Sequence, residues 1–361
     1  MSVQSSEPFL VARRLQTQRL IGWQFSSVAT AVAHFGAVQA QDLLGSLWAV
    51  GQRVSEATES TVEVAIEEGA ILRTWPLRGT IHYVTPADVR WLLMLTAERT
   101  MRGAAGRHRQ LGLEEQDFAR SRQALVKALE GGRRLERHAA YAVLEAAGVS
   151  TAGQRGIHIL GRLALEGVLC IGPRQGKQPT FVLLDEWVPP GRALSRDEAL
   201  AELARRYFTG HGPATLADYV WWSGLPITEA RAGLDAVSGE LAREDVNATT
   251  YWLAPFPQRV EMDSPVAHLL PVYDEYTLGY KDRSAFLSPE HAARPDAGNG
   301  IFRPPILIDG QIAGTWTRVL RKGKVVISRN LFRPITEGEA MALQLAAERY
   351  GAFLGLAAVL D

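Results

Sequence analysis

The sequence predicts a mainly α-helical α+β protein, built from three tandem winged helix-turn-helix units and a C-terminal β-rich domain. Three observations favour this fold. The chain has 361 residues, which is too long for one small core. Two helices followed by a hairpin can be read three times along it. Short strand-like runs then dominate towards the C-terminus. The expected domains are residues 1–115, 116–192, 193–264 and 265–361.

The first unit is expected to contain one helix at residues 41–52 and a second helix at 60–68. Ser60 and Glu63 have the spacing of a capping box, in which each side chain accepts a hydrogen bond from the other residue's backbone N–H at the start of a helix. Residues 71–84 follow as a hairpin. Helix, helix and hairpin is the order of a winged helix-turn-helix.

The middle unit shows the same pattern most clearly. Residues 136–148 form an Ala-rich helix that ends at a glycine. Thr151 and Gln154 have capping-box spacing and are expected to open the second helix. Two strand-like runs follow at 168–172 and 180–184. The sequence therefore predicts a second winged helix here.

The third unit begins at a further capping box, formed by Thr215 and Asp218. A second helix is expected at residues 228–241, and 251–253 is expected to return as a strand. Only the last part of the chain departs from this order.

The C-terminal part is expected to be a small α+β domain. Asp309 and Gly310 form a tight hairpin turn between two of its strands, and residues 336–355 form a closing amphipathic helix. The strands are expected at 271–276, 306–309, 311–317 and 324–329.

Composition limits the compartment and the kind of nucleic-acid contact. Basic and acidic residues number 39 each, which argues against a highly basic protein that coats DNA. Cys170 is the only cysteine and lies among apolar residues, so we expect a buried structural thiol in a reducing compartment. Residues 1–8 show no basic stretch followed by an apolar one, so we expect no signal peptide, and no apolar run is long enough to span a membrane. We expect a cytoplasmic monomer.

A winged helix usually reads DNA with the outer face of its second helix, and only one of the three second helices has the right charge. The first and third carry several carboxylates, which phosphates would repel. The middle one carries Arg155, His158 and Arg162. Further basic clusters fit a duplex that is contacted from several sides, although solvated surface is an equal alternative for each. From these clusters we expect Arg107, Arg109, Arg318, Arg321, Lys322 and Lys324 to contact DNA.

Five sequence blocks resemble the bacterial AlkZ-like winged-helix family. They lie in order at 38–42, 72–82, 212–225, 270–283 and 308–316, and so span most of the chain. The resemblance implies a C-shaped stack of winged helices and a DNA glycosylase that removes bulky or crosslinking N7-alkylated purines from double-stranded DNA. It also implies a Gln-aliphatic-Gln catalytic motif, which Gln39, Ala40 and Gln41 match. Self-resistance to an alkylating antibiotic and general repair both stay open.

Two glutamines suit this reaction, although such a pair by itself is usually solvent-facing or a helix cap. An N7-alkylated purine is already a cation, so its glycosidic bond breaks without strong acid assistance. The side chains of Gln39 and Gln41 are then needed to hold a water and stabilise an oxocarbenium-like state. A neutral amide is a weaker base than a carboxylate and leaves normal bases untouched.

Other polar residues are expected to be structural. Asp42 is a less favoured carboxylate and more simply stabilises the start of a helix. Asp274 and Glu275 are expected in an ion pair within a strand, with Arg283 as a candidate partner. His82, on a strand, is expected to be a buried structural histidine. The histidines show no metal-ligand spacing and no glycine loop would cradle phosphates, so no metal or cofactor is expected.

Two other functions stay open. A non-enzymatic winged-helix DNA-binding regulator is favoured by the basic face of Arg155, His158 and Arg162, because fold alone does not give function. A protein-interaction scaffold is favoured by the acidic second helices and the zero net charge.

Overall fold

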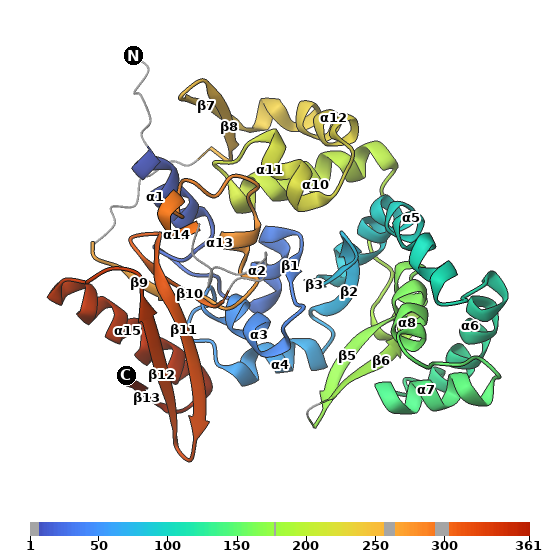
Figure 1. Ribbon diagram of the computed structural model, residues 1–361. Helices are drawn as coiled ribbons and strands as arrows, with labels where there is room; N and C mark the ends of the chain where they lie inside the picture. The colour runs from blue at the N-terminus through green and yellow to red at the C-terminus, as the bar shows by residue number, and fades with distance from the viewer. Residues whose placement is uncertain (1–6, 177, 256–263, 293–302) are drawn as a thin grey trace. The chain divides into compact units, whose positions relative to one another are not determined.

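The computed structural model describes residues 7–176, 178–255, 264–292 and 303–361 (Figure 1). Most of the N-terminal segment that lacks a signal-peptide pattern lies outside them. The chain divides into two compact units: Met1–Val62 with Leu200–Asp361, and Glu63–Ala199. The division into four domains remains a prediction, because compact units and recurring modules divide a chain in different ways.

Unit 1 contains both ends of the chain and mixes helices with strands. Its first part holds a two-residue strand between two short helices. Its second part begins with three helices and a hairpin. The elements are α1 (Glu7–Thr17), α2 (Val28–Phe35), β1 (Val38–Gln39), α3 (Leu43–Gly51), α10 (Arg196–His211), α11 (Leu216–Ser223), α12 (Ile227–Val237), β7 (Ala242–Val246) and β8 (Thr249–Leu253). The helices α4 (Glu59–Glu67) and α10 both run across the boundary between the units.

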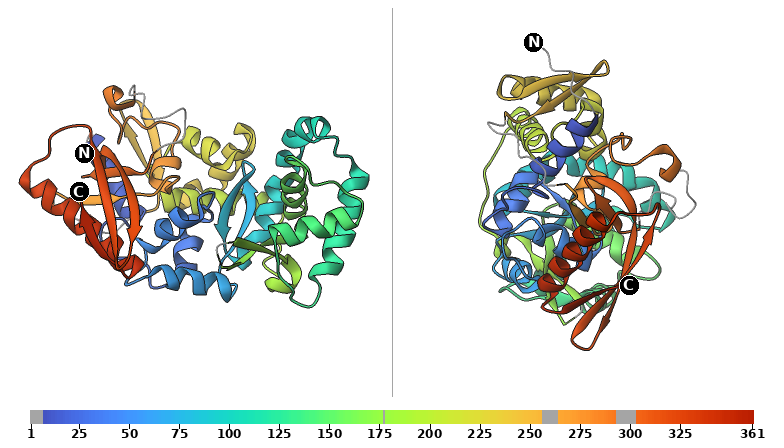
Figure 2. Two further views of the ribbon diagram at one scale, coloured as in Figure 1. Left: turned by 60° about the horizontal axis from the view of Figure 1, so that its bottom comes forward. Right: turned by 90° about the vertical axis from the view of Figure 1, so that its left-hand side faces the viewer.

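The C-terminal part of unit 1 is a sheet covered by one long helix (Figure 2). The strand order is β13-β12-β11-β10-β9, antiparallel except that β13 is parallel to β12. Asp309 and Gly310 have positive φ angles of 49° and 77° in the predicted hairpin turn. The elements are β9 (Ala267–Leu269), α13 (Glu275–Leu278), α14 (Pro289–Ala292), β10 (Pro305–Ile308), β11 (Gln311–Arg321), β12 (Lys324–Leu331), α15 (Glu337–Leu354) and β13 (Ala357–Leu360).

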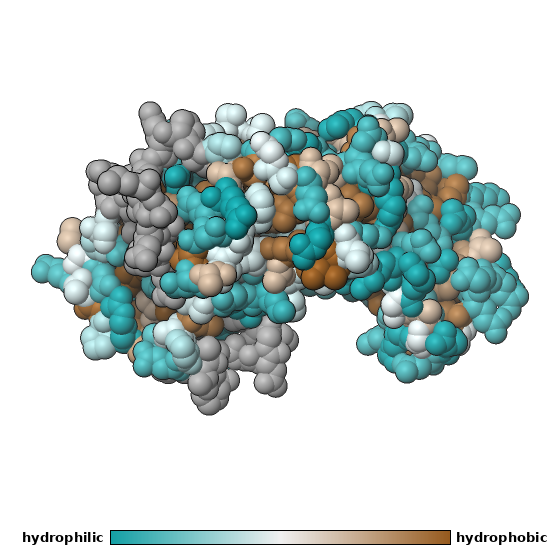
Figure 3. All heavy atoms as spheres, turned by 90° about the horizontal axis from the view of Figure 1, so that it is seen from above, coloured by the Kyte–Doolittle hydropathy of each residue, from teal (hydrophilic) through white to brown (hydrophobic). Residues whose placement is uncertain are grey.

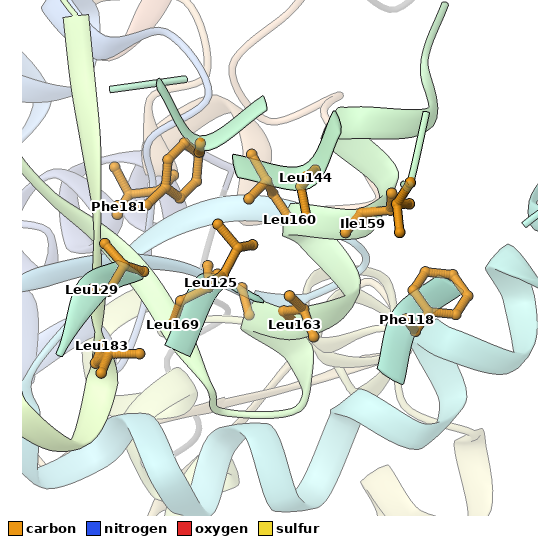
Figure 4. Packing of buried hydrophobic residues seen from close by; sticks show 14 of the residues in the cluster. Phe118, Leu125, Leu129, Leu144, Ile159, Leu160, Leu163, Leu169, Phe181 and Leu183 are labelled. Carbon is orange, nitrogen blue, oxygen red and sulfur yellow. The ribbon is translucent and has the colours of Figure 1, made fainter. Parts of the chain in front are cut away.

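Unit 2 packs helices against a sheet whose strands follow the order β3-β2-β5-β6-β4. Leucine and phenylalanine side chains of α6, α7, α8, β5 and β6 meet in its core (Figure 4). A Cβ atom at Gly156 would lie 2.5 Å from the Tyr141 ring, so the small residue lets α7 and α8 pack closely. The elements are β2 (Leu72–Leu77), β3 (Thr80–Val84), α5 (Pro86–Gln110), α6 (Glu115–Leu129), β4 (Leu135–Glu136), α7 (Arg137–Ala146), α8 (Arg155–Leu165), β5 (Leu169–Gln175), β6 (Gln178–Leu183) and α9 (Leu184–Trp187).

Two of the predicted capping boxes are wrong. At α8, the N–H of Thr151 donates to Glu145 Oε1 at 2.6 Å, so the helix begins later, with Gln154 as its N-cap. At α4, Thr58 and Thr61 form the reciprocal pair, two residues before the expected one. In both places a competing oxygen close in sequence takes the N–H groups of the helix start. The box of Thr215 and Asp218 is confirmed.

The predicted strand at 271–276 is also wrong. Tyr273 has a φ of 66°, which breaks the extended backbone, and Asp274 then caps a short helix instead. Its side chain accepts the N–H of Tyr276 at 2.9 Å. The short side chain of an aspartate therefore turns the chain where apolar periodicity suggested a strand.

The mixed α and β character predicted from the sequence is present in both units. Two helices followed by a two-stranded hairpin occur as α3–α4–β2–β3, α7–α8–β5–β6 and α11–α12–β7–β8. Cys170 is buried on β5, and burial raises the pKa of its thiol to about 12, in keeping with a structural role. No helix within the described residues is long and apolar enough to cross a membrane.

Candidate active site

The two glutamines lie on an extended segment before α3 rather than at the start of that helix. Gln39 ends β1 and its side chain is buried, with 7% of the residue exposed. Gln41 is exposed, and α3 begins two residues after it, at Leu43. The expected helix at 41–52 therefore starts too early. The segment presents one glutamine to the interior of unit 1 and the other to the surface.

The carboxylate of Glu275 holds this segment from the inside. Its Oε1 accepts the backbone N–H of Gln39 at 2.8 Å. Its Oε2 accepts the indole N–H of Trp222 at 2.9 Å and lies 3.0 Å from Nε2 of His211. When Glu275 is ionised it only accepts, so Nε2 of His211 is then a donor, while Nδ1 lies 3.3 Å from the carbonyl of Tyr207. Glu275 is 1% exposed, so three polar partners surround a buried carboxyl group, as such a group requires.

Aromatic rings fix the donors to Glu275. The ring of Tyr207 stacks on His211 with centroids 4.7 Å apart, and its hydroxyl donates to the carbonyl of Gly279 at 2.7 Å. The Tyr280 hydroxyl donates to the His211 carbonyl at 2.7 Å. Burial raises the pKa of both tyrosines, so these phenols stay neutral donors.

A buried ion pair places Glu275 at the start of α13. Arg53 donates to both oxygens of Asp274, at 2.7 and 2.8 Å, with side-chain exposures of 2% and 0%. Asp274 is the N-cap of α13, and Glu275 is its first residue. The expected ion pair at Asp274 is thus present, but its partner is Arg53 and not Arg283. The two carboxylates have different tasks, because one caps the helix and the other bonds to Gln39.

Sequence reasoning missed Glu275, His211 and Trp222 as parts of the site. The available signal was the pair of adjacent carboxylates among Tyr273, Tyr276 and other apolar residues. Carboxylates in such a setting are buried and therefore need donors. The identity of those donors depends on α10 and α11, which lie far away in sequence and carry no motif of their own.

Arg318 lies close to the exposed end of the glutamine segment. Its pKa is lowered by burial, and the neighbouring charges of Asp42 and Glu59 oppose that shift. Its guanidinium carbon lies 5.3 Å from the centre of the Tyr350 ring. Asp42 is exposed at the N-cap position of α3 and makes no capping hydrogen bond with its side chain. The charge of Arg318 is thus within electrostatic range of Asp42, which follows Gln41 in the chain.

Arg321, Lys322 and Lys324 lie at the tip of the β11–β12 hairpin. All are exposed, and none makes an ion pair with another described residue. Arg321 pairs with Lys324 across a two-residue turn. Hydrophilic residues cover much of the face drawn in Figure 3, with hydrophobic ones in separate areas between them. The hairpin tip is a local basic patch on a protein without net charge.

The basic face of α8 is bonded within unit 2. Arg155 lies 3.5 Å from Asp117 and donates to two carbonyls of the α5–α6 turn, and Arg162 bonds Glu166 at 2.5 Å. Each arginine side chain is 18% exposed. The pKa of His158 is lowered by partial burial and by the charge of Arg107, which favours the neutral ring at pH 7. A phosphate at this face would compete with carboxylates that are already in place.

The remaining predicted positions lie on unit 2. Arg107 donates to the side chains of Gln110 and Gln154, while Arg109 is exposed without an ion pair among the described residues. His82 is fully buried, with Nδ1 at 2.9 Å from the carbonyl of Thr80, as expected for a structural histidine. Within the described part of the chain, no three His, Cys, Asp or Glu side chains are grouped to hold a metal ion.

Three comparisons with known proteins agree. The sequence matches the family described as DNA glycosylase AlkZ-like over residues 32–353. It is similar to the interstrand DNA cross-link repair glycosylase of Streptomyces sahachiroi, with 26% identity over 331 residues, or 84% of this chain and 86% of the relative. The fold is similar to the solved structure of Streptomyces sahachiroi DNA glycosylase AlkZ, with a TM-score of 0.80 and 22% identity, over 99% of this chain and 100% of that chain.

Proposed function

The chain belongs to the AlkZ-like DNA glycosylase family, and on this premise we propose that it hydrolyses the N-glycosidic bond of N7-alkylated purines in double-stranded DNA. The products are the free purine and an abasic site. In this proposal Gln39 and Gln41 position the attacking water and stabilise the oxocarbenium-like sugar. The observation that carries it is the fixed segment itself, with Gln39 anchored on Glu275 and Gln41 exposed two residues later.

The chemistry follows from what the two side chains can and cannot do. A glutamine carbonyl accepts a hydrogen bond from water and so orients it towards the sugar carbon. Neither amide is a strong base, so the enzyme depends on a leaving group that is already cationic. This dependence is a source of selectivity, because an unmodified purine is a much poorer leaving group.

Glu275 is a positioning residue in this mechanism and not the base. Three donors occupy its two oxygens, and the carboxylate is buried. Taking a proton from water would break one of those hydrogen bonds inside unit 1. Its contribution is to hold the peptide of Gln39 still, so that the glutamine segment keeps one geometry.

We rank the proposed DNA contacts by whether each basic side chain is already paired with a carboxylate. The foremost proposed phosphate contacts are Arg321, Lys322 and Lys324 at the hairpin tip and Arg109 on α5, because none of them is paired with a carboxylate of the described residues. Arg318, on β11, interacts electrostatically with Asp42, the residue after Gln41. Arg107, Arg155, His158 and Arg162 form a secondary set. The three helix-helix-hairpin segments are proposed to be the winged-helix units that carry these residues.

The size of the lesion is proposed from a relative. The Streptomyces sahachiroi protein is named for interstrand cross-link repair, and we extend that substrate class, with simple N7-methylated purines, to this chain. Gln41 is exposed, which suits an adduct too bulky for an enclosed pocket.

The test is an assay of base release. Duplex DNA with N7-methylguanine is incubated with the full chain, and free base and abasic sites are measured together with DNA binding. We expect release of the alkylated base and none from an undamaged duplex. Binding without release, for both N7-methylguanine and a crosslinked purine, would instead support the regulator hypothesis, in which one operator sequence binds several orders more tightly than others.

A further inference from the structure

A second candidate site lies in unit 1 away from the glutamine segment. It is a cavity of about 380 Å³ between α1, the start of α11, the β7–β8 hairpin and the segment after α13. This volume is within the range of small-molecule sites, about 300–1,000 Å³. Neither glutamine lines it, and neither does Glu275.

The cavity is lined by a buried cation that no carboxylate of the described residues neutralises. Arg14 is 2% exposed, and its Nε donates to the carbonyl of Pro213 at 3.0 Å. Its guanidinium carbon lies 3.7 Å from the centre of the Tyr280 ring. Nη1 has no hydrogen-bond partner, and no carboxylate of the described residues pairs with it. An arginine keeps its charge in a protein, so this burial is costly unless an anion compensates it.

The buried carboxylate in the cavity wall has another task. Oδ2 of Asp218 accepts the N–H and the hydroxyl of Thr215, both at 2.9 Å. Oδ1 accepts the N–H groups of Lys281 and Asp282, at 2.8 and 3.3 Å. Four donors therefore saturate Asp218, which closes the capping box of α11 and does not pair with Arg14.

The other groups at the cavity suit a ligand with several oxygens. The exposed Lys281 lines it and makes no ion pair with a described residue. Ser284 and Asn247 add neutral polar groups, and Asp282 is exposed, with Oδ1 already bonded to the N–H of Ser284. Arg14 and Lys281 supply fixed and mobile donors for the oxygens of a phosphate group, while the carboxylates of Asp218 and Asp282 in the lining already accept backbone N–H groups.

We propose that this cavity binds a phosphate group between the guanidinium of Arg14 and the ammonium of Lys281. The same chemistry is offered by a phosphate of the DNA backbone and by a free phosphate or phosphate monoester. Phosphate binding at this site does not require base release, so it is tested independently of the proposed glycosylase activity.

The test is a calorimetric titration of the full chain with sodium phosphate, compared with sodium chloride at matched ionic strength. We expect saturable binding of phosphate only. Lys281→Ala should weaken it about tenfold, the value of one charged hydrogen bond. The matched control, Lys127→Ala, removes an exposed lysine of α6 and should leave it unchanged. Arg14→Gln should abolish phosphate binding. If the Arg14→Gln variant does not fold, the comparison of Lys281→Ala with Lys127→Ala tests the proposal.

The results of these titrations distinguish phosphate binding at this cavity from its absence. Equal heats for phosphate and chloride, or equal phosphate affinities for Lys281→Ala and the wild type, would overturn the proposal. A second titration in the presence of saturating undamaged duplex identifies the source. Loss of phosphate binding indicates a backbone phosphate, and unchanged binding indicates a free phosphate or monoester.

Discussion

Gln39 is fixed through its backbone and not only through its side chain. The donor at 2.8 Å from Glu275 is the peptide N–H, so this bond holds the backbone whatever side chain stands at position 39. Two contributions to base release can therefore be measured separately, whereas a substitution of Gln39 alone could change both. The side chain supplies the polar group, and Glu275 supplies its position.

Glu275→Gln tests the positioning contribution. The amide of the new side chain has one acceptor and one donor, so either Gln39 N–H or Trp222 N–H loses its partner. We expect kcat for base release to fall about 100-fold, the effect of a small misplacement, with the Kd for DNA unchanged. Single-turnover kinetics and DNA binding on the same preparations check both numbers.

Two controls keep this prediction specific. Glu130→Gln makes the same change of charge at an exposed position after α6 and should behave as the wild type. Glu275→Asp retains the charge but shortens the reach, and should restore less than half of the lost rate. A fall in kcat that is matched by a fall in melting temperature, with no difference between Gln and Asp, would indicate a purely structural role.

At the scale of single residues, the sequence indicated Gln39 and Gln41 only through family resemblance. Their spacing has no meaning by itself, because a Gln-x-Gln pair occurs on many helix starts. Glu275 could not be assigned, since the apolar residues around it suggested a strand and its donors come from α10 and α11. The positive φ of Tyr273, which turns the chain into α13, leaves no clear pattern in sequence.

At the scale of elements, the β11–β12 hairpin is the basic surface that is best prepared for DNA. Its three tip cations are exposed and unpaired among the described residues, whereas those of α8 are bonded to Asp117, Glu115 and Glu166. Binding through the hairpin costs no internal ion pair. Binding through α8 would have to replace several.

The double variant Lys322→Ala/Lys324→Ala tests whether the hairpin contacts DNA. We expect a weaker affinity for all duplexes alike, and a slope of log K against log salt that is smaller in magnitude by about two, because each phosphate contact contributes about 0.9. Fluorescence anisotropy at several salt concentrations gives the slope. Lys127→Ala is the control for loss of a lysine. An unchanged slope in the double variant would place the DNA elsewhere.

The local sequence predicted helix caps and turns correctly where only one hydrogen-bonding arrangement is available. Thr215 and Asp218 form their capping box, and Asp309-Gly310 forms its turn, since no neighbouring group competes. Thr151 failed because Glu145, six residues earlier, reaches its N–H and hydroxyl. Helix order and the C-terminal strands expected at 306–309, 311–317 and 324–329 were therefore predictable, but exact helix starts and the segment at 271–276 were not.

At the scale of the whole molecule, a buried histidine couples stability to pH. His268 lies on β9, and burial, then the charges of Arg349 and Arg53, lower its pKa to about 3. The unfolded chain binds a proton near pH 6.5 and the folded protein does not, so the stability contributed at neutral pH is lost as pH falls from about 6.5 towards 3.

His268→Gln should flatten this dependence. Between pH 7 and pH 5 the free energy of unfolding should fall by about 2 kcal/mol less in the variant than in the wild type, because one pKa unit corresponds to about 1.4 kcal/mol. Urea unfolding at both pH values measures it. His138→Gln, at an exposed position of α7, serves as the control. Parallel pH dependences for wild type and His268→Gln would show that His268 is protonated in the folded protein.

The central claim is that two neutral amides on a fixed segment release a cationic purine. The most direct measurement is the single-turnover rate of N7-methylguanine release by the wild type, Gln39→Ala and Gln41→Ala, with DNA binding measured in parallel. We expect release by the wild type and a loss of about 10²–10⁴-fold in each variant, as for a positioned proton acceptor. DNA affinity should stay within about twofold, since an uncharged side chain adds nothing to the phosphate contacts that dominate binding. Variants that release the base as fast as the wild type would contradict it.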